Sequence, residues 1–135
     1  MIEYVSLFVA SFLAATILPF ASEIPLAILV RRTGDLLAPV LVATAGNYLG
    51  ACTTYLLARG AVRRFAPRAE ASSPRAMAAL RRYGSPALLM SWVPVIGDAV
   101  VVVAGAAKIP FAAFSLWTVI GKAARYAMVA WLARP

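Results

Sequence analysis

Four long apolar segments, separated by polar links, dominate the pattern of the chain. They run over residues 4–30, 36–58, 85–107 and 111–133. Each has at least the roughly 20 residues that a helix needs to cross the hydrocarbon core of a bilayer. The pattern therefore predicts an all-α integral membrane protein in which residues 1–135 form a single membrane domain.

Residues 4–30 and 85–107 differ from ordinary membrane spans because prolines and acids interrupt them near the middle. The interrupting residues are Pro19, Ser22 and Glu23 in the first segment and Pro94, Gly97 and Asp98 in the second. Proline removes a backbone donor and breaks a helix, and a carboxylate in hydrocarbon is costly unless it faces protein, water or a cation. Both segments are therefore predicted to be re-entrant helical hairpins whose broken backbone is shielded by protein. Four full crossings remain the alternative.

The two halves of the chain repeat each other at an offset of 75 positions. The equivalent pairs are Pro19 with Pro94, Glu23 with Asp98, Gly46 with Gly121, and Asn47 with Lys122. Each copy, residues 4–58 and 85–133, is predicted to be a hairpin followed by one transmembrane helix, at 36–58 or 111–133. One crossing per copy forces the second copy to be inverted relative to the first. Inverted repeats with broken helices are typical of secondary transporters, whose sites lie near the midplane of the membrane.

Composition supports membrane residence and argues against several kinds of site. Apolar residues make up 63% of the 135 residues and charged residues 13%, against roughly 45–50% and about 25% in average globular chains. The sequence has no histidine, and Cys52 is its single cysteine. The commonest general base and the usual zinc ligands are therefore missing. No cofactor, metal site or enzymatic activity is expected.

The net charge of +8 comes mainly from arginines between the second and third apolar segments, in residues 59–84. Excess arginine in a short loop marks the cytoplasmic side of a membrane protein and attracts anionic lipid headgroups. Aromatic residues do not alternate with these arginines as base stacking requires, so nucleic acid is not an expected partner. The charge count leaves the topology open. Four full crossings would separate Lys108 from this loop, whereas hairpins would place Arg31 and Arg32 on the opposite side.

Four charged residues, Glu23, Asp98, Lys122 and Arg125, lie inside the apolar segments. Each isolated charge at the centre of a bilayer costs roughly 2.5–3.5 kcal/mol on insertion scales. In a polar cavity, the two acids would carry protons, while Lys122 and Arg125, three positions apart on one helix face, would hold an anionic headgroup. The alternative is that acid–base pairs only hold the helices together.

Small and polar residues mark where the segments are expected to meet. Gly46 and Gly50 form a Gly-x-x-x-Gly face, which together with Gly121 is interpreted as close helix packing. Asn47 is interpreted as a cavity residue because it is equivalent to Lys122 in the repeat. The other residues predicted to line the cavity or to break the helices are Pro19, Ser22, Ser91, Pro94 and Gly97.

Several of these residues fall in motifs of a known family. The motifs are Leu18–Glu23, Gly46–Gly50, Arg82–Gly84 and Ser91–Asp98. Together they resemble the DedA family, in particular its short YqaA-like branch, within the wider group of VTT-domain scramblases. The resemblance spans most of the chain and implies a bacterial inner-membrane protein with two re-entrant hairpins. Some members are taken to flip undecaprenyl phosphate or other phospholipids in dependence on the proton gradient.

The resemblance carries over to single positions. Glu23 matches the membrane acid of the family's first hairpin, and Pro94 matches the central proline of its Arg-x-x-Pro-x-x-Arg motif. Ser91 and Gly97 stand where that motif has its arginines, which are the phosphate-binding groups that the resemblance implies. The two cations of the fourth apolar segment are the candidates to replace that charge.

The sequence thus predicts a multi-pass inner-membrane protein that moves a lipid phosphate or another anionic amphiphile, with protons as the coupling ion. Membrane lipids are the expected partners, and a homodimer would supply helices that one short copy lacks. A second hypothesis is a non-transporting scaffold or assembly protein with structural ion pairs, which dimerises through Gly46 and Gly50. Hydration separates the two hypotheses: a dry, fully paired cluster favours the scaffold, and an open, wet funnel favours the transporter.

Overall fold

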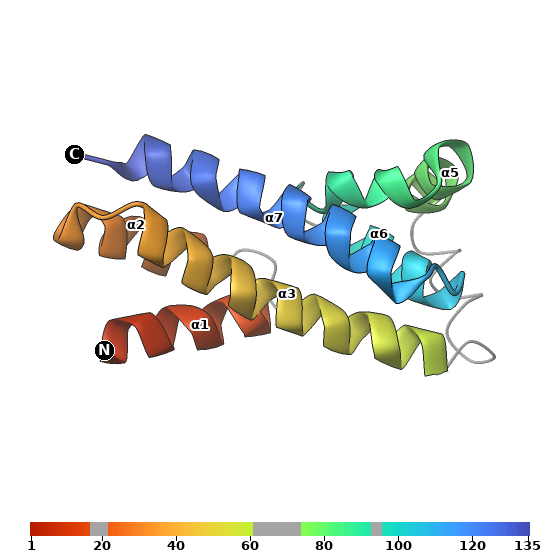
Figure 1. The fold of residues 1–135 in the computed structure, drawn as a ribbon, viewed down its shortest axis with the longest axis horizontal. Helices are drawn as coiled ribbons and strands as arrows, with labels where there is room; N and C mark the ends of the chain where they lie inside the picture. The colour runs from red at the N-terminus through yellow and green to blue at the C-terminus, as the bar shows by residue number, and fades with distance from the viewer. Residues whose placement is uncertain (17–21, 61–73, 93–95) are drawn as a thin grey trace.

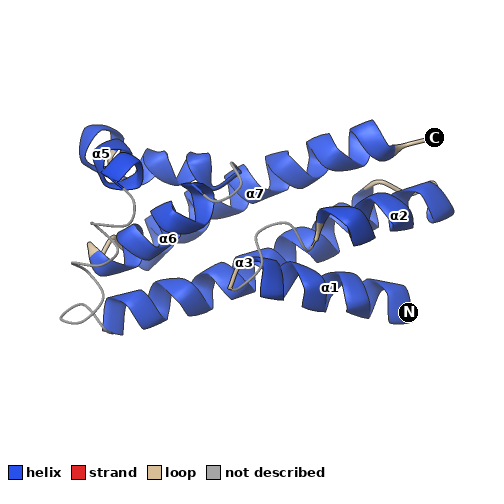
Figure 2. Ribbon diagram, turned by 180° about the vertical axis from the view of Figure 1, so that it is seen from behind, coloured by secondary structure: helices blue, strands red, loops and turns tan. Residues whose placement is uncertain are grey.

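The computed structural model describes residues 1–16, 22–60, 74–92 and 96–135. Within these ranges the chain forms helices and no strand (Figure 2), which confirms the all-α prediction. In chain order the elements are α1 (Ile2–Ala14), α2 (Glu23–Thr33), α3 (Leu37–Gly60), α5 (Pro74–Tyr83), the 3₁₀ helix η1 (Ser85–Trp92), α6 (Ile96–Ala106) and α7 (Phe111–Ala133).

Two long helices, α3 and α7, pack together and run in opposite directions along the molecule (Figure 1). They have 24 and 23 residues, so each is about 35 Å long, which exceeds the roughly 30 Å hydrocarbon core of a bilayer. Their bounds differ by at most two residues from the predicted 36–58 and 111–133. Among the described helices, α3 alone has both the length and the apolarity of a membrane span. α7 has the length but carries Lys122 and Arg125.

The first apolar segment starts and finishes at the same end of the molecule. Glu3, at the start of α1, forms an ion pair with Arg32, near the end of α2. The neighbouring Arg31 donates from Nε to the Ala133 carbonyl oxygen, 3.2 Å away at the end of α7. Figure 1 shows α1 and α2 at the end that holds both chain termini. α1 and α2 therefore lead away from this end and back to it.

The third apolar segment lies at the opposite end. Figure 1 shows α5 and α6 there, with α6 beside the carboxyl end of α3 and α5 packed on α6. The link from α6 to α7 is bound to α3, because Tyr55 donates to the Ile109 carbonyl oxygen and Arg59 Nη1 lies 3.4 Å from the same atom. Lys108 is therefore at the same end of the molecule as Arg59. The first helix of this segment, η1, is a 3₁₀ helix, whereas the first helix of the first apolar segment, α1, is an α-helix.

Residues 59–84 are predicted to be a basic loop, and for part of this range the prediction is wrong. Pro74–Tyr83 form the helix α5. Its residues Ala76 and Leu80, four positions apart, are buried in the same apolar cluster as parts of η1 and α6, while Arg81 and Arg82 stay exposed. An apolar helix face is stabilised by the partner that covers it, and the charge count does not reveal that partner.

Two apolar clusters fill the interior. The one nearer the chain termini includes Leu7, Leu26, Val30, Ala43 and Ala130. The other includes Tyr55, Leu88, Val100, Ala104 and Phe114. The hairpin helices contribute across the halves of the chain, because α2 packs on α7 and α6 packs on α3. This interlocking leaves the middle of α3 and α7 as the place where the two halves meet.

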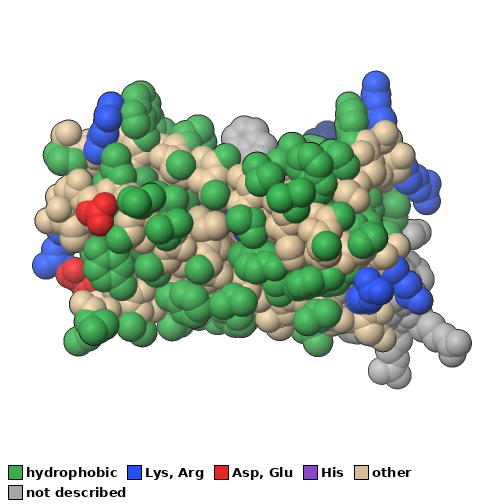
Figure 3. Space-filling model, in the orientation of Figure 1, with side chains coloured by type: hydrophobic (Ala, Val, Ile, Leu, Met, Phe, Trp, Pro, Cys, Tyr) green, Lys and Arg blue, Asp and Glu red, His purple; other side chains and the backbone are tan. Residues whose placement is uncertain are grey.

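The surface separates apolar from charged side chains along the length of the molecule. On the face shown in Figure 3, charged side chains lie at the two ends and apolar side chains between them. The exposed apolar residues of the long helices include Leu41, Leu49, Leu57, Leu116, Ile120 and Met128. An exposed apolar region of this kind is typical of a surface that contacts a membrane or another protein.

Close packing of α3 against α1 depends on the absence of side chains at two positions. A Cβ at Gly46 would lie 2.5 Å from the Phe8 carbonyl oxygen, and one at Gly50 would overlap the Phe12 carbonyl oxygen. α1 of the same chain therefore occupies the Gly-x-x-x-Gly face. Within this chain, Gly46 and Gly50 therefore serve the packing of α1 on α3, and a dimer through these two glycines would have to displace α1.

Replacing Gly50 by alanine is expected to lower the free energy of unfolding by about 1–3 kcal/mol, because the added methyl group overpacks the α1–α3 contact. Thermal unfolding in detergent measures the effect. Gly60→Ala is the matched control. A Cβ there meets nothing within 4 Å in the described part of the chain, so this variant reports the higher helix propensity of alanine, at most about 1 kcal/mol. Equal stability changes in the two variants would contradict the prediction.

Candidate functional site

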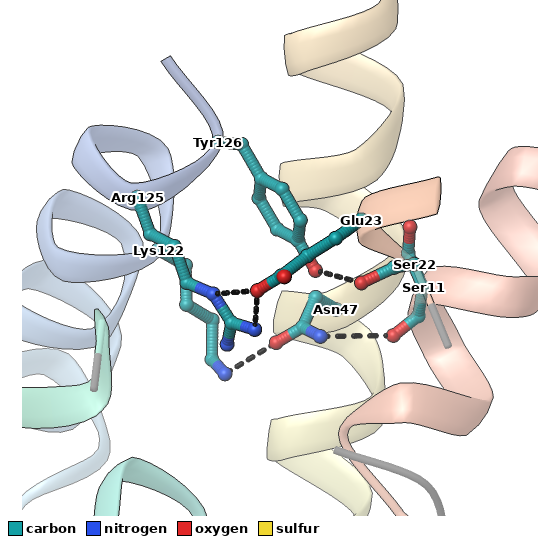
Figure 4. Close-up of polar contacts among 7 residues, drawn as sticks. All are labelled: Ser11, Ser22, Glu23, Asn47, Lys122, Arg125 and Tyr126. Carbon is teal, nitrogen blue, oxygen red and sulfur yellow. Dashed lines mark hydrogen bonds and ion pairs between the residues drawn. The ribbon is translucent and has the colours of Figure 1, made fainter. Parts of the chain in front are cut away.

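A polar cluster lies where α1, α2, α3 and α7 meet (Figure 4). Its members are Ser11, Ser22, Glu23, Asn47, Lys122, Arg125 and Tyr126. α7 contributes three of them, at positions 122, 125 and 126, because residues three and four apart lie on one helix face. All seven except Glu23 are buried. Sequence positions more than a hundred residues apart are thereby brought into one site.

Glu23 and Arg125 form the charged centre of the cluster. Arg125 donates from Nε to Glu23 Oε1 at 3.0 Å, and its Nη2 contacts the same oxygen. The side chain of Arg125 is 8% exposed and that of Glu23 is 32% exposed. Glu23 is also the first residue of α2, where the helix dipole favours a negative charge. The carboxylate is therefore held by two local sources of positive potential.

Asn47 links Lys122 to α1. Lys122 Nζ donates to Asn47 Oδ1, and Asn47 Nδ2 donates to the Ser11 carbonyl oxygen at 3.0 Å. Lys122 is 1% exposed and Asn47 is 3% exposed. Because each end of the amide has its own partner, the side chain of Asn47 is fixed in one orientation. One amide thus connects three helices around a buried cation.

A hydroxyl pair lies beside the ion pair. Ser22 Oγ and the Tyr126 hydroxyl are 2.7 Å apart and share a hydrogen bond. Ser22 precedes Glu23 and Tyr126 follows Arg125, so the hydrogen bond and the ion pair join the same two helices next to each other. Sequence reasoning did not single out Tyr126 or Ser11. The signal for Tyr126 was available, since it lies one turn after Lys122 on the face that carries the two cations.

The structure brings together five of the residues predicted for the site, and the others lie elsewhere or are described only in part or not at all. Ser22, Glu23, Asn47, Lys122 and Arg125 meet in the cluster. Pro19 and Pro94 lie outside the described residues, and only the backbone is described for Ser91, in η1, and for Asp98, in α6. Gly97 and Gly121 are buried in α6 and α7. In the described part of the chain, no three His, Cys, Asp or Glu side chains come together as a metal site requires.

Asn47 and Lys122 are also related by the repeat predicted from the sequence. They are 75 positions apart, which is the offset of the repeat found in the sequence. The two equivalent residues of the halves therefore contact each other directly, at the contact between α3 and α7.

Two grooves in the described part of the surface lie away from this cluster. One follows the outer face of α1. The other, of about 270 Å³, lies between α1 and α2, and its lining includes Ser6, Pro25, Ile28 and Arg32. Neither groove is lined by Glu23 or by a residue of α7.

The VTT-domain family matches residues 2–133 of the chain. The chain belongs to the VTT-domain family. This match confirms the resemblance to DedA proteins that the motifs indicated, and it makes the chain a helical membrane protein of that family.

Individual VTT-domain relatives cover nearly the same length. The inner membrane protein YqaA of Escherichia coli K12 is 41% identical over 128 residues, which is 93% of this chain and 87% of that protein. An uncharacterized protein of Haemophilus influenzae is 39% identical over 140 residues, with coverages of 96% and 86%. No solved structure matches the chain. The printed name of the E. coli relative agrees with the inner-membrane location expected from the motifs.

The contact between Asn47 and Lys122 is expected to stabilise the fold. Asn47→Leu removes one acceptor from Lys122 and one donor from the Ser11 carbonyl oxygen, and should lower the free energy of unfolding by about 1–3 kcal/mol. A double-mutant cycle with Lys122→Met should give a coupling energy of roughly 0.5–3 kcal/mol. Thr53→Val is the control, because the Thr53 hydroxyl donates to the Leu49 carbonyl oxygen of the same helix, α3. Additive effects of Asn47→Leu and Lys122→Met would contradict a direct coupling.

Proposed function

We propose that this VTT-domain protein moves a lipid phosphate or another anionic amphiphile across the bacterial inner membrane and that this movement is coupled to protons. The observation that carries the proposal is the Glu23–Arg125 ion pair, placed where two hairpin arms and two long helices meet. A guanidinium that holds a carboxylate can hold a phosphate oxygen in the same way, since its planar donors fit both anions.

In this mechanism the Glu23 carboxylate and the anion compete for Arg125, so that protonation of Glu23 favours binding of the anion. When Glu23 is ionised, it occupies Arg125. Protonation removes the charge of Glu23, weakens its attraction to Arg125 and releases donors of the guanidinium for the headgroup. Deprotonation restores the ion pair and expels the anion. Lys122, on the same face of α7, adds a second positive charge to the field that the headgroup meets.

We also propose that the chain is an inverted repeat and that the broken segments are re-entrant hairpins. Three observations support this. The α1–α2 pair and the η1–α6 pair lie toward opposite ends (Figures 1 and 2). α2 packs on α7 as α6 packs on α3. Asn47 contacts its own counterpart, Lys122, and equivalent residues related by a two-fold axis touch each other only near that axis.

The scaffold function is the second candidate, and a specific observation favours it. Lys122 and Arg125 are nearly fully buried and take part in ion-pair or hydrogen-bond contacts, and neither described groove is lined by them. Burial and pairing of these two cations are what the scaffold hypothesis expects. The transport function therefore requires a second state in which the cluster opens to water, whereas the scaffold function requires none.

The test is a flipping assay on protein reconstituted into liposomes, with a fluorescent lipid phosphate and an imposed pH gradient. Arg125→Met should reduce the rate roughly ten-fold or more, because a hydrogen bond to a charged group contributes about 1.5–3 kcal/mol and 1.4 kcal/mol corresponds to about ten-fold. Glu23→Gln should remove the dependence on the pH gradient. Arg32→Gln is the matched control, since Arg32 forms an exposed pair with Glu3 at the end of the molecule.

The results separate the two functions. Normal flipping by Arg125→Met and Glu23→Gln would overturn the proposed mechanism. Wild-type protein that flips no lipid phosphate, together with a lower unfolding temperature of Arg125→Met, would support the scaffold function.

A further inference from the structure

Three hydroxyl groups lie together on one side of the ion pair, and we call them the hydroxyl site: Ser11, Ser22 and Tyr126. They come from α1, the N-terminus of α2 and α7. Ser11 and Ser22 are fully buried and Tyr126 is 1% exposed. Figure 4 shows the Tyr126 hydroxyl and the Glu23 carboxylate pointing into the same space between α2 and α7.

One member of the hydroxyl site has no hydrogen-bond partner. Ser11 Oγ is buried and unbonded within the described part of the chain, although it lies near the Tyr126 phenol. Buried polar atoms in folded proteins almost always have a partner, and an ordered water commonly supplies it. A buried water typically makes about three hydrogen bonds to such groups. The hydroxyl site offers three groups to such a water, namely the hydroxyls of Ser11, Ser22 and Tyr126.

The charges around Glu23 favour the approach of a proton to its carboxylate past the hydroxyl site and not past Arg125 and Lys122. Arg125 and Lys122 reach the cluster from α7, and both are positive. From α1 and α3, the described neighbours are the neutral Ser11 and Asn47. A proton that approaches past the cations is repelled, and the repulsion is strong where the local dielectric constant is low. A proton that approaches through hydroxyl groups meets no like charge among them.

We propose that the hydroxyl site binds a water molecule and carries protons between it and Glu23, with Tyr126 as the last donor. The inference rests on the proposed role of Glu23 as the proton-linked acid. In the described contacts the Tyr126 hydroxyl bonds to Ser22 and not to Glu23, so in the loading step it first turns to the carboxylate. Its O–H bond then breaks as the proton bonds to a Glu23 carboxylate oxygen. Tyr126 takes the Ser22 proton, Ser22 takes one from the bound water, and the water takes one from hydronium. Every hydroxyl group is restored, and Glu23 gains one proton.

A purely structural role for the Ser22–Tyr126 hydrogen bond would affect stability but not the rate at which Glu23 gains a proton. The experiment therefore follows that rate directly. Reconstituted protein is subjected to a rapid fall in pH, and the infrared C=O band of the protonated carboxyl is recorded over time. The band is assigned to Glu23 by its loss in Glu23→Gln. This measurement does not depend on whether the protein flips any lipid.

Tyr126→Phe, which keeps the ring, should slow the appearance of the band by about ten-fold or more. Ser22→Ala and Ser11→Ala should slow it as well. Tyr48→Phe is the matched control, because the Tyr48 hydroxyl makes a similar hydrogen bond between α3 and α7, 2.6 Å to Ser115 Oγ, and it should leave the rate unchanged. If Tyr126→Phe does not fold, Ser22→Ala removes the same hydrogen bond without touching the ring.

Each other outcome overturns a defined part of the proposal. A wild-type rate in both Tyr126→Phe and Ser22→Ala would mean that protons reach Glu23 directly at its exposed edge, and the relay would be wrong. Equal slowing in Tyr48→Phe would make the effect a general loss of α7 packing. The absence of a Glu23 band in wild-type protein at any pH would overturn both the relay and the proton-linked function.

Discussion

Burial of charge in a mostly apolar chain is the constraint on which the rest of this structure depends. Arg125 and Lys122 lie near the middle of α7, where lipid could not solvate them. α2 must therefore begin where Glu23 reaches Arg125, and α3 must present Asn47 to Lys122. These two requirements fix how α2 and α3 lie against α7. The apolar clusters on either side then fill the space that this arrangement leaves.

Small residues make the polar contacts reachable. Gly46 and Gly50 let the backbone of α1 approach α3, which brings the Ser11 carbonyl oxygen within 3.0 Å of Asn47. Gly105 does the same for α6, where a Cβ would lie 2.5 Å from the Tyr55 carbonyl oxygen. In a membrane, where lipid is as apolar as the helices, such backbone approach and interhelical hydrogen bonds are the main sources of specific association. Close helix packing at the glycines thus places the polar groups of this fold within hydrogen-bonding distance.

The polar cluster around Glu23 and Arg125 would have a different role in a scaffold protein than in a transporter. A buried ion pair adds little net stability relative to apolar residues that fill the same space, whereas removing one partner is costly. If the ion pair served stability alone, apolar residues in the same space would stabilise this chain, which is 63% apolar, as well or better. In the proposed function, the two cations would hold the anion, and the acid and the neutral hydroxyls would take up the proton that is coupled to it.

The sequence by itself determined the membrane class, the family and the bounds of the two long helices to within two residues. It also singled out Glu23, Lys122, Arg125 and Asn47, which the structure brings together in one cluster. Helix length, apolarity and the cost of intramembrane charge are local quantities, so they can be read along the chain. Only the tertiary structure decided that Arg125 pairs with Glu23, that Tyr126 and Ser11 join the cluster, and that residues 74–83 form a helix on the apolar cluster around Tyr55 and Phe114. Those outcomes depend on which faces of helices distant in sequence meet, and neither composition nor spacing determines that.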